Sequence, residues 1–302
     1  MKSLAGRTAV ITGAGSGFGR EFARIAAHAG MNLVLADIQN DALASVQAEL
    51  SGAGAQVLAL RTNVAEAAAV QGLADATVAR FGAPHLVFNN AGVGGTGGLL
   101  WENSARDWEW TLGVNLWGVI HGVRIFTPLM LAAARADAGY EGHLVNTASM
   151  AGLLTPPNMG VYNVTKHGVV ALTETLYQDL SLVTSQVGCS VLCPYFVPTG
   201  IFQSERNRPA DLTDASGPTA SQALAREMGQ KAVNSGKVSA AQVAQMTFEA
   251  IGERRFYIYS HPNALGNVET RMRAIVDGRN PPDPYAARPE VGAALRERLR
   301  GA

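Results

Sequence analysis

The sequence predicts an α/β fold in which helices cover both faces of a doubly wound parallel sheet of about seven strands. Short apolar runs alternate along the chain with longer segments that carry apolar residues at helical spacing. Many of these runs are apolar throughout, as strands buried on both faces must be. When strands and helices alternate along the chain, each helix connects two parallel strands of the sheet, and such crossover connections are right-handed.

The expected strands follow one another with a helix after almost every one. We expect strands at residues 8–11, 32–36, 56–61, 86–89, 143–147, 189–193 and 255–260. We expect helices at 22–29, 41–50, 65–81, 108–133, 164–182, 239–251 and 291–299. Residues 201–236 are polar and carry no strand signal. The chain is therefore expected to form a single domain over residues 1–302, with an excursion at 200–236 and a C-terminal extension at 261–302.

The composition is that of an ordinary globular enzyme and argues against several functions. Formal net charge is zero and no block of Lys or Arg occurs, so we expect no capture of nucleic acid or of an anionic membrane. Polar residues and Pro128 interrupt the most apolar stretch, residues 114–134, which argues against a membrane span. The amino-terminal residues do not resemble a secretory signal. We expect a cytoplasmic protein.

The two cysteines, Cys189 and Cys193, lie in the sixth expected strand. Their even spacing puts both on one face, about 13 Å apart at the usual rise, which is too far for a disulfide. Two thiols do not make a zinc site. We expect two small buried hydrophobic side chains and no metal.

A glycine-rich turn follows the first expected strand. Residues 12–19 read Thr-Gly-Ala-Gly-Ser-Gly-Phe-Gly and lead into a helix. Glycines at such a turn let the backbone approach a pyrophosphate, and the helix N-terminus offers unpaired N–H groups. A glycine-rich turn alone is weak evidence, but this one opens a βαβ unit, the context that a Rossmann-type dinucleotide site needs. We expect the cofactor to contact Gly13, Ser16, Gly17, Phe18 and Gly19.

Asp37 follows the second expected strand. A carboxylate there can accept hydrogen bonds from the adenosine ribose hydroxyls and would repel a 2′-phosphate, and residues 36–38 include no arginine to receive one. The alternative is that Asp37 caps the next helix, although Asn40 and Asp41 are better placed to do so. The sequence therefore favours NAD over NADP.

Three residues of complementary chemistry lie between the fifth expected strand and the next helix. Tyr162 and Lys166 are four residues apart and share a helix face, and Ser149 follows the strand. A phenol is a poor base at neutral pH, but a nearby ammonium group and a cationic nicotinamide ring would stabilise the phenolate. Ser149 could hold the substrate oxygen meanwhile. The alternative is a tyrosine packed between helices, an incidental lysine and a serine that ends a strand.

With these residues in place, the chain resembles the short-chain dehydrogenase/reductase family over about residues 5–260. The glycine turn matches the family's Thr-Gly-x-x-x-Gly-x-Gly motif, and residues 89–92 read Asn-Asn-Ala-Gly, as in its second motif. The family's catalytic residues match Asn115, Ser149, Tyr162 and Lys166. The resemblance implies an NAD-dependent oxidoreductase that moves a hydride between nicotinamide and a carbinol or carbonyl carbon, with Tyr162 as general acid/base.

The resemblance also implies roles that the residues alone leave open. It implies that Asn115 holds a water molecule in a proton relay and that Lys166 forms a hydrogen bond with the nicotinamide ribose. Without it, a buried Asn115 could simply satisfy backbone groups where a helix kinks. The further cofactor contacts that it implies are Asn63, Val64, Asn90, Ala91, Gly92, Tyr162, Lys166 and, from the family's carboxamide-binding segment, Pro194, Val197 and Thr199.

Two positions depart from the family pattern. Asn63 stands where many members have an Asp that meets the adenine, and an amide oxygen can still accept the same hydrogen bond. Tyr195 stands where the family usually has Gly, so the shape of the pocket near the nicotinamide cannot be carried over.

The resemblance places the substrate wall between Ser149 and Tyr162, at residues 195–196 and in the excursion. The first two segments offer apolar and aromatic side chains and no Arg or Lys: Leu153, Leu154, Met159, Tyr195 and Phe196. Such a pocket favours a neutral, largely apolar secondary alcohol or ketone. Arg206, Arg208 or Arg226 could alter this by turning in from the excursion.

Two other functions stay open. One is an NAD(P)H-dependent reductase of a ketone or a 3-oxoacyl thioester, although Asp37 argues against NADPH. The other is a non-catalytic dinucleotide-binding regulator, which the complete set of catalytic residues disfavours. The family commonly pairs its two long helices between subunits, here 108–133 and 164–182 with four tryptophans in or near the first. We therefore expect a homodimer or homotetramer, whereas the alternative is that the tryptophans pack internally.

Overall fold

The computed structural model describes residues 3–214 and 217–300 and contains a seven-stranded sheet. The strands are β1 (Thr8–Thr12), β2 (Asn32–Asp37), β3 (Val57–Arg61), β4 (Leu86–Asn89), β5 (Gly142–Thr147), β6 (Val187–Cys193) and β7 (Tyr257–Tyr259). Their order is β3-β2-β1-β4-β5-β6-β7, and every neighbouring pair is parallel. The expected doubly wound parallel sheet is confirmed.

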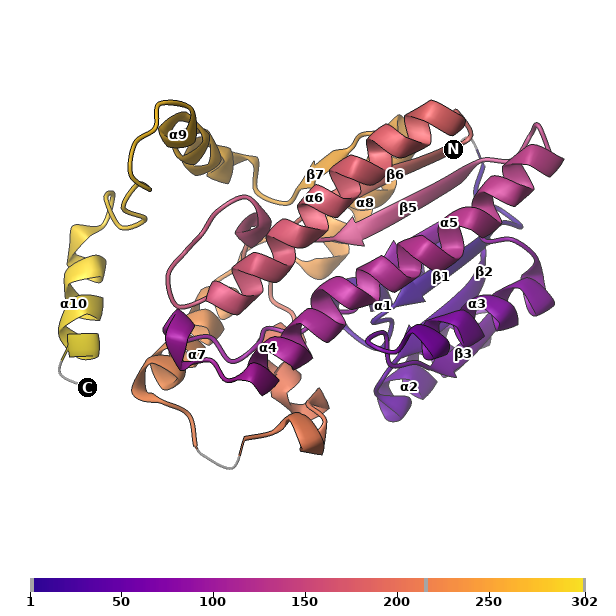
Figure 1. Cartoon of the computed structure of the whole chain (residues 1–302). Coiled ribbons are helices and arrows are strands. Elements are labelled where there is room, and N and C mark those ends of the chain that lie inside the picture. Colours follow the sequence, from indigo (N-terminus) through magenta and orange to yellow (C-terminus); the bar gives the residue numbers. More distant parts are fainter. Residues whose placement is uncertain (1–2, 215–216, 301–302) are drawn as a thin grey trace.

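Helices cover both faces of this sheet (Figure 1). One face carries α1 (Gly17–His28), α2 (Asn40–Gly52) and α8 (Ala240–Glu253), whose buried side chains share a core cluster with the strands. The other face carries α3 (Ala67–Phe81), α5 (Gly118–Ala136) and α6 (Gly160–Val183), which share a second cluster. Two short 3-10 turns connect elements on the way, η1 (Leu100–Glu102) and η3 (Met150–Gly152).

The central strands are apolar on both faces because both faces are covered. All residues of β1 and β4 are buried, and Phe22 of α1 stacks on Phe88 of β4 with ring centroids 4.6 Å apart. The chain winds outward from β1 to β3 on one side and resumes at β4 on the other. A crevice therefore opens at the carboxyl ends of β1 and β4, where open α/β sheets bind their ligands.

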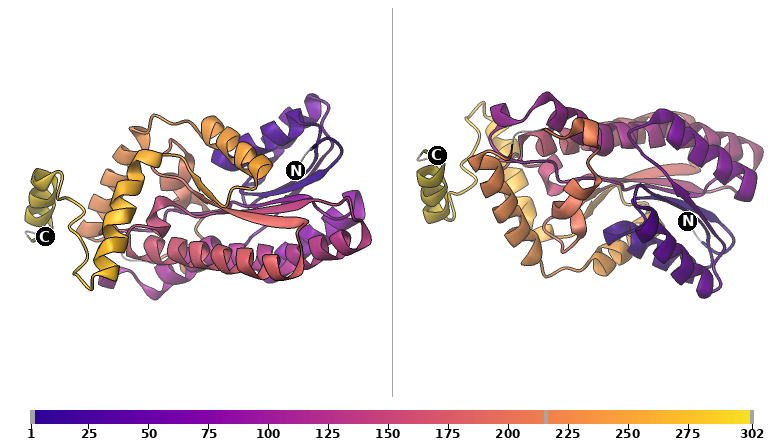
Figure 2. Two further views of the ribbon diagram at one scale, coloured as in Figure 1. Left: turned by 90° about the horizontal axis from the view of Figure 1, so that it is seen from above. Right: turned by 90° about the horizontal axis from the view of Figure 1, so that it is seen from below.

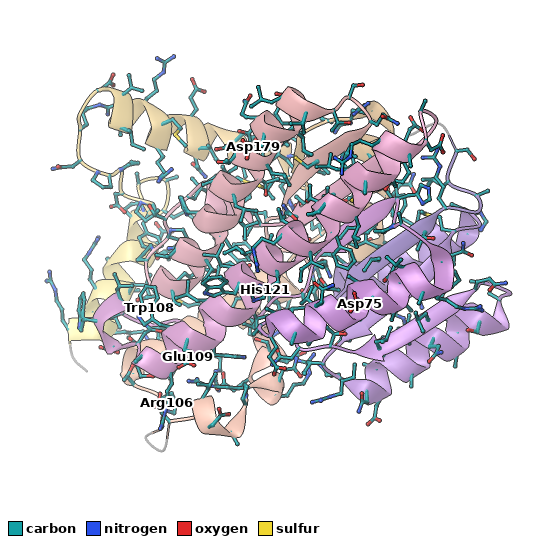
Figure 3. All side chains as sticks on the ribbon, turned by 45° about the vertical axis from the view of Figure 1, so that its right-hand side comes forward. Asp75, Arg106, Trp108, Glu109, His121 and Asp179 are labelled. Atoms are coloured by element: carbon teal, nitrogen blue, oxygen red, sulfur yellow. The ribbon has the colours of Figure 1, made fainter. Side chains whose placement is uncertain are left out.

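The helix expected at residues 108–133 is interrupted. It consists of α4 (Ala105–Leu112), a π turn η2 (Gly113–Trp117) and α5. Asn115 is the buried residue of the π turn. By length and apolar composition alone the run Ala105–Ala136 could cross a membrane, a test that core helices also pass. Here Phe126 and Met130 are fully buried in the second core cluster. In Figure 3 the run lies between α3, marked by Asp75, and α6, marked by Asp179.

The excursion is more ordered than its polar sequence suggests. It contains the 3-10 segments η4 (Gly200–Asn207) and η5 (Ala210–Leu212) and a helix that the periodicity did not predict, α7 (Ala220–Asn234). A capping box starts α7: the Thr219 hydroxyl accepts from the Gln222 N–H, and the Gln222 side chain accepts from the Thr219 N–H. This signal was present in the sequence and would have located the helix.

The C-terminal extension holds the turn η6 (Pro262–Ala264) and two helices, α9 (Leu265–Val276) and α10 (Pro289–Arg300). The expected helix at 291–299 is confirmed as α10, whereas α9 was not predicted. In both views of Figure 2, α10 stands apart from the sheet, at the end of the molecule where α7 and α9 lie. Cys189 and Cys193 are buried free thiols, as expected.

Candidate active site

The glycine turn after β1 forms a cradle that side chains would fill. Gly13 and Gly17 have positive φ angles of 67° and 52°, which L side chains rarely adopt. A Cβ on Gly19 would lie only 2.0 Å from the Gly13 carbonyl oxygen, so the first turn of α1 presses directly on the loop. The backbone N–H groups at the start of α1 thus face the crevice without covering side chains, the arrangement that receives a diphosphate.

Asp37 lies at the carboxyl end of β2, on the wall of the same cavity. One carboxylate oxygen accepts from the Gly15 N–H at 2.8 Å and the other from the Gln39 N–H at 2.9 Å. The helix α2 begins at Asn40 with Gln39 as its N-cap, so the expectation that Asn40 or Asp41 would cap it is wrong. Asp37 organises the turn before the helix, and its carboxylate stays available to ribose hydroxyls.

A chain of hydrogen bonds runs from the glycine turn to the lysine. The Asn90 side-chain amide donates to the Thr12 carbonyl oxygen at 3.0 Å and accepts from the Thr147 hydroxyl at 3.2 Å. The Lys166 ammonium then donates to the Thr147 carbonyl oxygen at 2.9 Å. Asn90 therefore joins the ends of β1, β4 and β5, and we call Thr12, Asn90, Thr147 and Lys166 the strand-end chain.

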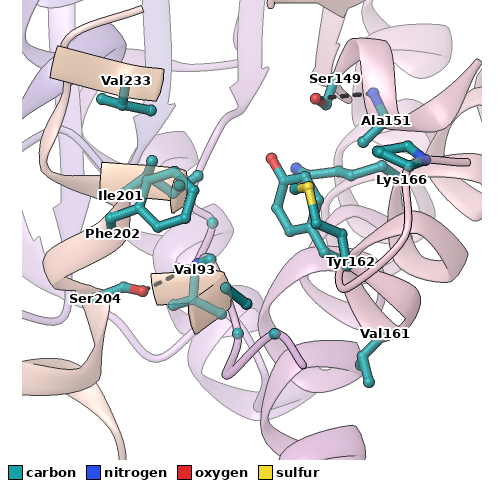
Figure 4. A pocket seen from close by; sticks show the side chains of 18 of the residues that line it. Val93, Ser149, Ala151, Val161, Tyr162, Lys166, Ile201, Phe202, Ser204 and Val233 are labelled. Atoms are coloured by element: carbon teal, nitrogen blue, oxygen red, sulfur yellow. Dashed lines mark hydrogen bonds between the residues drawn. The ribbon is translucent and has the colours of Figure 1, made fainter. Parts of the chain in front are cut away.

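The three residues of complementary chemistry meet beside this chain. The Lys166 Nζ lies 5.6 Å from the centre of the Tyr162 ring, one helical turn away on α6. Ser149 caps η3, accepting from the Ala151 N–H at 3.1 Å, and its hydroxyl donates to the Pro194 carbonyl oxygen at 3.3 Å. Figure 4 shows Ser149, Tyr162 and Lys166 together on one side of the cavity. The structure thus brings this predicted trio together.

Asn115 is fully buried in the π turn. Its side chain bonds both backbone groups of Val93, accepting from the N–H at 2.8 Å and donating to the carbonyl at 2.9 Å. A Cβ on Gly92 would lie 3.4 Å from Asn115 Oδ1 and 3.7 Å from Lys166 Nζ, so both polar atoms border the same small space. Asn115 therefore holds the loop after β4, as in the alternative that the sequence left open, a buried amide that satisfies backbone groups where a helix is interrupted.

Burial controls the protonation of the trio. It raises the pKa of the Tyr162 phenol to about 12, and the hydrogen bond with Ser149 opposes this rise. It lowers the pKa of the Lys166 ammonium to about 8. The predicted stabilisation of the phenolate needs a bound nicotinamide ring as well as the ammonium, and in the protein alone the ammonium is directed to the Thr147 carbonyl. At neutral pH the phenol carries its proton and the lysine its charge.

The trio opens onto a cavity of about 1940 Å³ that continues to the glycine turn and to Asp37. Most of the expected cofactor contacts line it: Gly13, Ser16, Gly17, Phe18, Asp37, Asn63, Val64, Asn90, Ala91, Gly92, Tyr162, Lys166, Pro194, Val197 and Thr199. Gly19 lies behind the turn, in contact with Gly13. The side-chain oxygen of Asn63 accepts a hydrogen bond from the Ala65 N–H at 3.2 Å, within the turn after β3.

The expected substrate wall is only partly correct. Leu154, Met159, Tyr195 and Phe196 line the cavity. Leu153 does not: it is packed in a third core cluster with Val169 and Val170, because η3 turns it toward α6. Sequence reasoning missed the apolar residues of the excursion that face Tyr162 across the cavity, Ile201, Phe202 and Val233, which Figure 4 shows on the opposite side.

The excursion is bound to the rest of the protein by a buried ion pair. Arg208 pairs with Asp107 of α4 at 2.8 Å, and the two side chains are 5% and 3% exposed. The Arg208 guanidinium also lies over the Trp110 ring, 5.2 Å from its centre. Arg208 therefore pairs with residues of the protein. It does not turn toward the substrate, an orientation that the sequence left open.

Comparison with known proteins identifies the family. The model of the short chain dehydrogenase family matches residues 7–210, and the chain therefore belongs to that family. It is 56% identical to a short-chain dehydrogenase/reductase of Burkholderia phymatum crystallised in complex with NAD. That match covers 94% of this chain and 99% of the other, with a TM-score of 0.91.

Two curated relatives share most of their length with this chain. A CLA biosynthesis dehydrogenase/reductase of Lactiplantibacillus plantarum is 32% identical, with 91% of this chain and 95% of the relative covered. A 1-deoxy-11-beta-hydroxypentalenate dehydrogenase of Streptomyces avermitilis is 34% identical, with 85% of each covered. The chain is thus an oxidoreductase of a family with dehydrogenases among its members.

Proposed function

We propose that this protein transfers a hydride between NAD and the carbinol or carbonyl carbon of a secondary alcohol or ketone, with Tyr162 as general acid/base. The observation that carries this proposal is the meeting of Ser149, Tyr162 and Lys166 on the wall of one cavity with the glycine turn and Asp37. The relative from Burkholderia phymatum that was crystallised with NAD supports the choice of cofactor. The glycine cradle fits a diphosphate, and Asp37 fits an unphosphorylated ribose.

The residues divide the work by what each can reach. The nicotinamide ring, when NAD is bound, supplies the hydride acceptor or donor. Tyr162 exchanges a proton with the substrate oxygen, and Ser149 holds that oxygen by a hydrogen bond. Lys166 keeps a positive charge near the phenol, and its charge favours the phenolate whenever the proton leaves. Asn115 fixes the loop after β4 beside Lys166, and we assign it a role in a proton relay that includes Lys166.

The substrate class follows from what faces Tyr162. Ile201, Phe202 and Val233 lie across the cavity, and Met159, Tyr195 and Phe196 extend the wall. Side chains of this kind fit a neutral, largely apolar substrate. The relative named 1-deoxy-11-beta-hydroxypentalenate dehydrogenase supports a hydroxyl group on a larger molecule as the reacting group.

Ketone reduction is the second direction that one observation favours. Because burial raises the pKa of Tyr162 to about 12, the phenol carries its proton at neutral pH, which is the protonation state that ketone reduction needs. The same site would then serve an NADH-dependent ketone reductase. A regulator that binds NAD without turnover has no such observation in its favour.

The test is Tyr162→Phe, assayed with NAD over a panel of secondary alcohols. We expect kcat/KM to fall by about 10²–10⁴, the usual value of general acid–base catalysis, with NAD affinity kept. Tyr177→Phe is the matched control, since this tyrosine lies on the outer face of the same helix and packs against Phe256. Full turnover by Tyr162→Phe would refute the mechanism, and hydroxy acids turning over far faster than neutral alcohols would refute the substrate class.

We also propose that the protein assembles as a homodimer or homotetramer in the cytoplasm. Trp117 and Val164 are about half exposed on η2 and α6, and Trp101 is almost entirely exposed. Trp110, by contrast, is buried under Arg208, so the expected alternative of internal packing holds for that tryptophan. Light scattering would measure the mass, and a monomer would overturn the proposal.

A further inference from the structure

The 3-10 segment η4 runs along the cavity wall from the glycine turn to the turn that follows Asp37. It starts after Thr199, whose methyl carbon would lie 3.5 Å from a Cβ on Gly17 in the glycine turn. It ends beside Gln39, two residues beyond Asp37, where Arg206 Nε lies 3.4 Å from the Gln39 side-chain oxygen. The segment therefore runs over the place where the glycine turn receives a diphosphate.

Arg206 is held there by neutral groups. Its Nη1 donates to the carbonyl oxygens of Gln203 at 2.5 Å and Gly200 at 3.3 Å. Turning the Gln39 amide by 180° brings its oxygen 3.1 Å from both Nε and Nη2. These contacts fix the guanidinium at the cavity wall but do not neutralise its charge, because all of them are amide oxygens.

No carboxylate within residues 3–214 and 217–300 lies within ion-pair distance, 4.0 Å, of Arg206. The adjacent Glu205 is directed away, toward Arg208 at 3.3 Å and Arg226 at 3.8 Å. Arg208, two residues on, is buried against Asp107. In the described chain, Arg206 is thus the cation of η4 whose charge is left for a ligand.

We propose that Arg206 contacts the diphosphate of the bound dinucleotide, on the side opposite to the glycine turn. The inference rests on the proposed NAD site and adds to it a side-chain contact from the excursion. A guanidinium offers several N–H donors in one plane and suits phosphate oxygens. Its position next to Gln39 places this charge between the glycine turn and the ribose end of the site. The segment η4, which lines the substrate side of the cavity, then also contacts the cofactor.

The test is a set of binding measurements by titration calorimetry, with NAD, ADP and adenosine as probes. The variants are Arg206→Gln, Arg206→Lys and, as control, Lys231→Gln, which removes one cation from α7 on the wall of the same cavity. We expect Arg206→Gln to weaken NAD and ADP by about tenfold, as for loss of one hydrogen bond to a charged group, and to leave adenosine unchanged. Arg206→Lys should recover part of the loss, Lys231→Gln should bind as the wild type, and added salt should shrink the difference.

Each other outcome has one meaning. Equal losses for adenosine and ADP would show that Arg206 only holds Gln39 in place, and the proposal would be overturned. Unchanged ADP affinity in Arg206→Gln would overturn it as well. Failure of the wild type to bind NAD would instead refute the proposed function.

Discussion

The buried pair of Arg208 and Asp107 predicts a large and non-additive effect on stability. Their atoms are 2.8 Å apart and both side chains are almost fully buried, so neither charge can find water when its partner is removed. Breaking such a pair costs about 3–5 kcal/mol, whereas replacing both charges together is often nearly neutral. We therefore expect Arg208→Met and Asp107→Asn each to lower the free energy of unfolding strongly. The double variant should lose no more stability than the single variant that is less destabilised.

The structure refines these magnitudes. In Asp107→Asn, Glu205 at 3.3 Å and Asp214 at 3.8 Å remain to offset the Arg208 charge. In Arg208→Met, Asp107 keeps the N–H of Ser104 at 2.8 Å, because it belongs to the capping box of α4. Each single change should therefore fall at the lower end of the range, about 3 kcal/mol. At about 2–4 °C per kcal/mol for a chain above 150 residues, Tm should fall by about 6 °C or more.

The assay is thermal unfolding followed by calorimetry at one protein concentration. The pair Arg298 and Glu227 supplies the control: its atoms are 3.0 Å apart, but the side chains are 56% and 63% exposed. An exposed pair contributes about 0–1 kcal/mol, so Arg298→Met should hardly move Tm. If Arg208→Met moved Tm no further than Arg298→Met, or if the two single changes summed in the double variant, the reasoning would be refuted.

Two further predictions concern the chemistry. Asp37→Asn removes the charge that repels a 2′-phosphate, and this repulsion is about 1–3 kcal/mol near a protein surface. The ratio of kcat/KM for NADP to that for NAD should therefore rise roughly ten- to hundredfold. An unchanged ratio would show that Asp37 does not set the preference. Because the pKa of Tyr162 is raised to about 12, kcat/KM for alcohol oxidation should climb with pH from neutrality until Lys166, whose pKa is about 8, loses its charge. Ketone reduction should show no such rise, and a flat oxidation profile would contradict the reasoning.

Periodicity and motif placement predicted the sheet and the centre of the site. The strands could be located because burial on both faces leaves continuous apolar runs, and the glycine turn and Asp37 could be placed because each follows such a strand. Tyr162 and Lys166 could be paired because helical spacing puts them on one face. These features are local, or follow directly from parallel strand order.

What depended on tertiary packing could not be predicted. A helix kink at Asn115 was one alternative from the sequence, but its partner Val93, 22 positions away, could not be identified from spacing. Leu153 looked like a wall residue, but η3 turns it into the core. The helix α7 escaped because its stripe of apolar residues is weak and its buried face is set by η4, where Phe202 approaches Gly229 closely. The pKa of Tyr162 depends on burial that no spacing reveals.

The strand-end chain has a consequence for how the protein can vary. Through the amide of Asn90, the loop that would cradle the coenzyme and the amine that would assist proton transfer are fastened to the same three strand ends. A displacement at either end therefore shifts the other, which would keep the proposed hydride and proton positions aligned. Variation in the substrates that the enzyme accepts is left to α7 and the tail, which contribute no residue to this chain of hydrogen bonds.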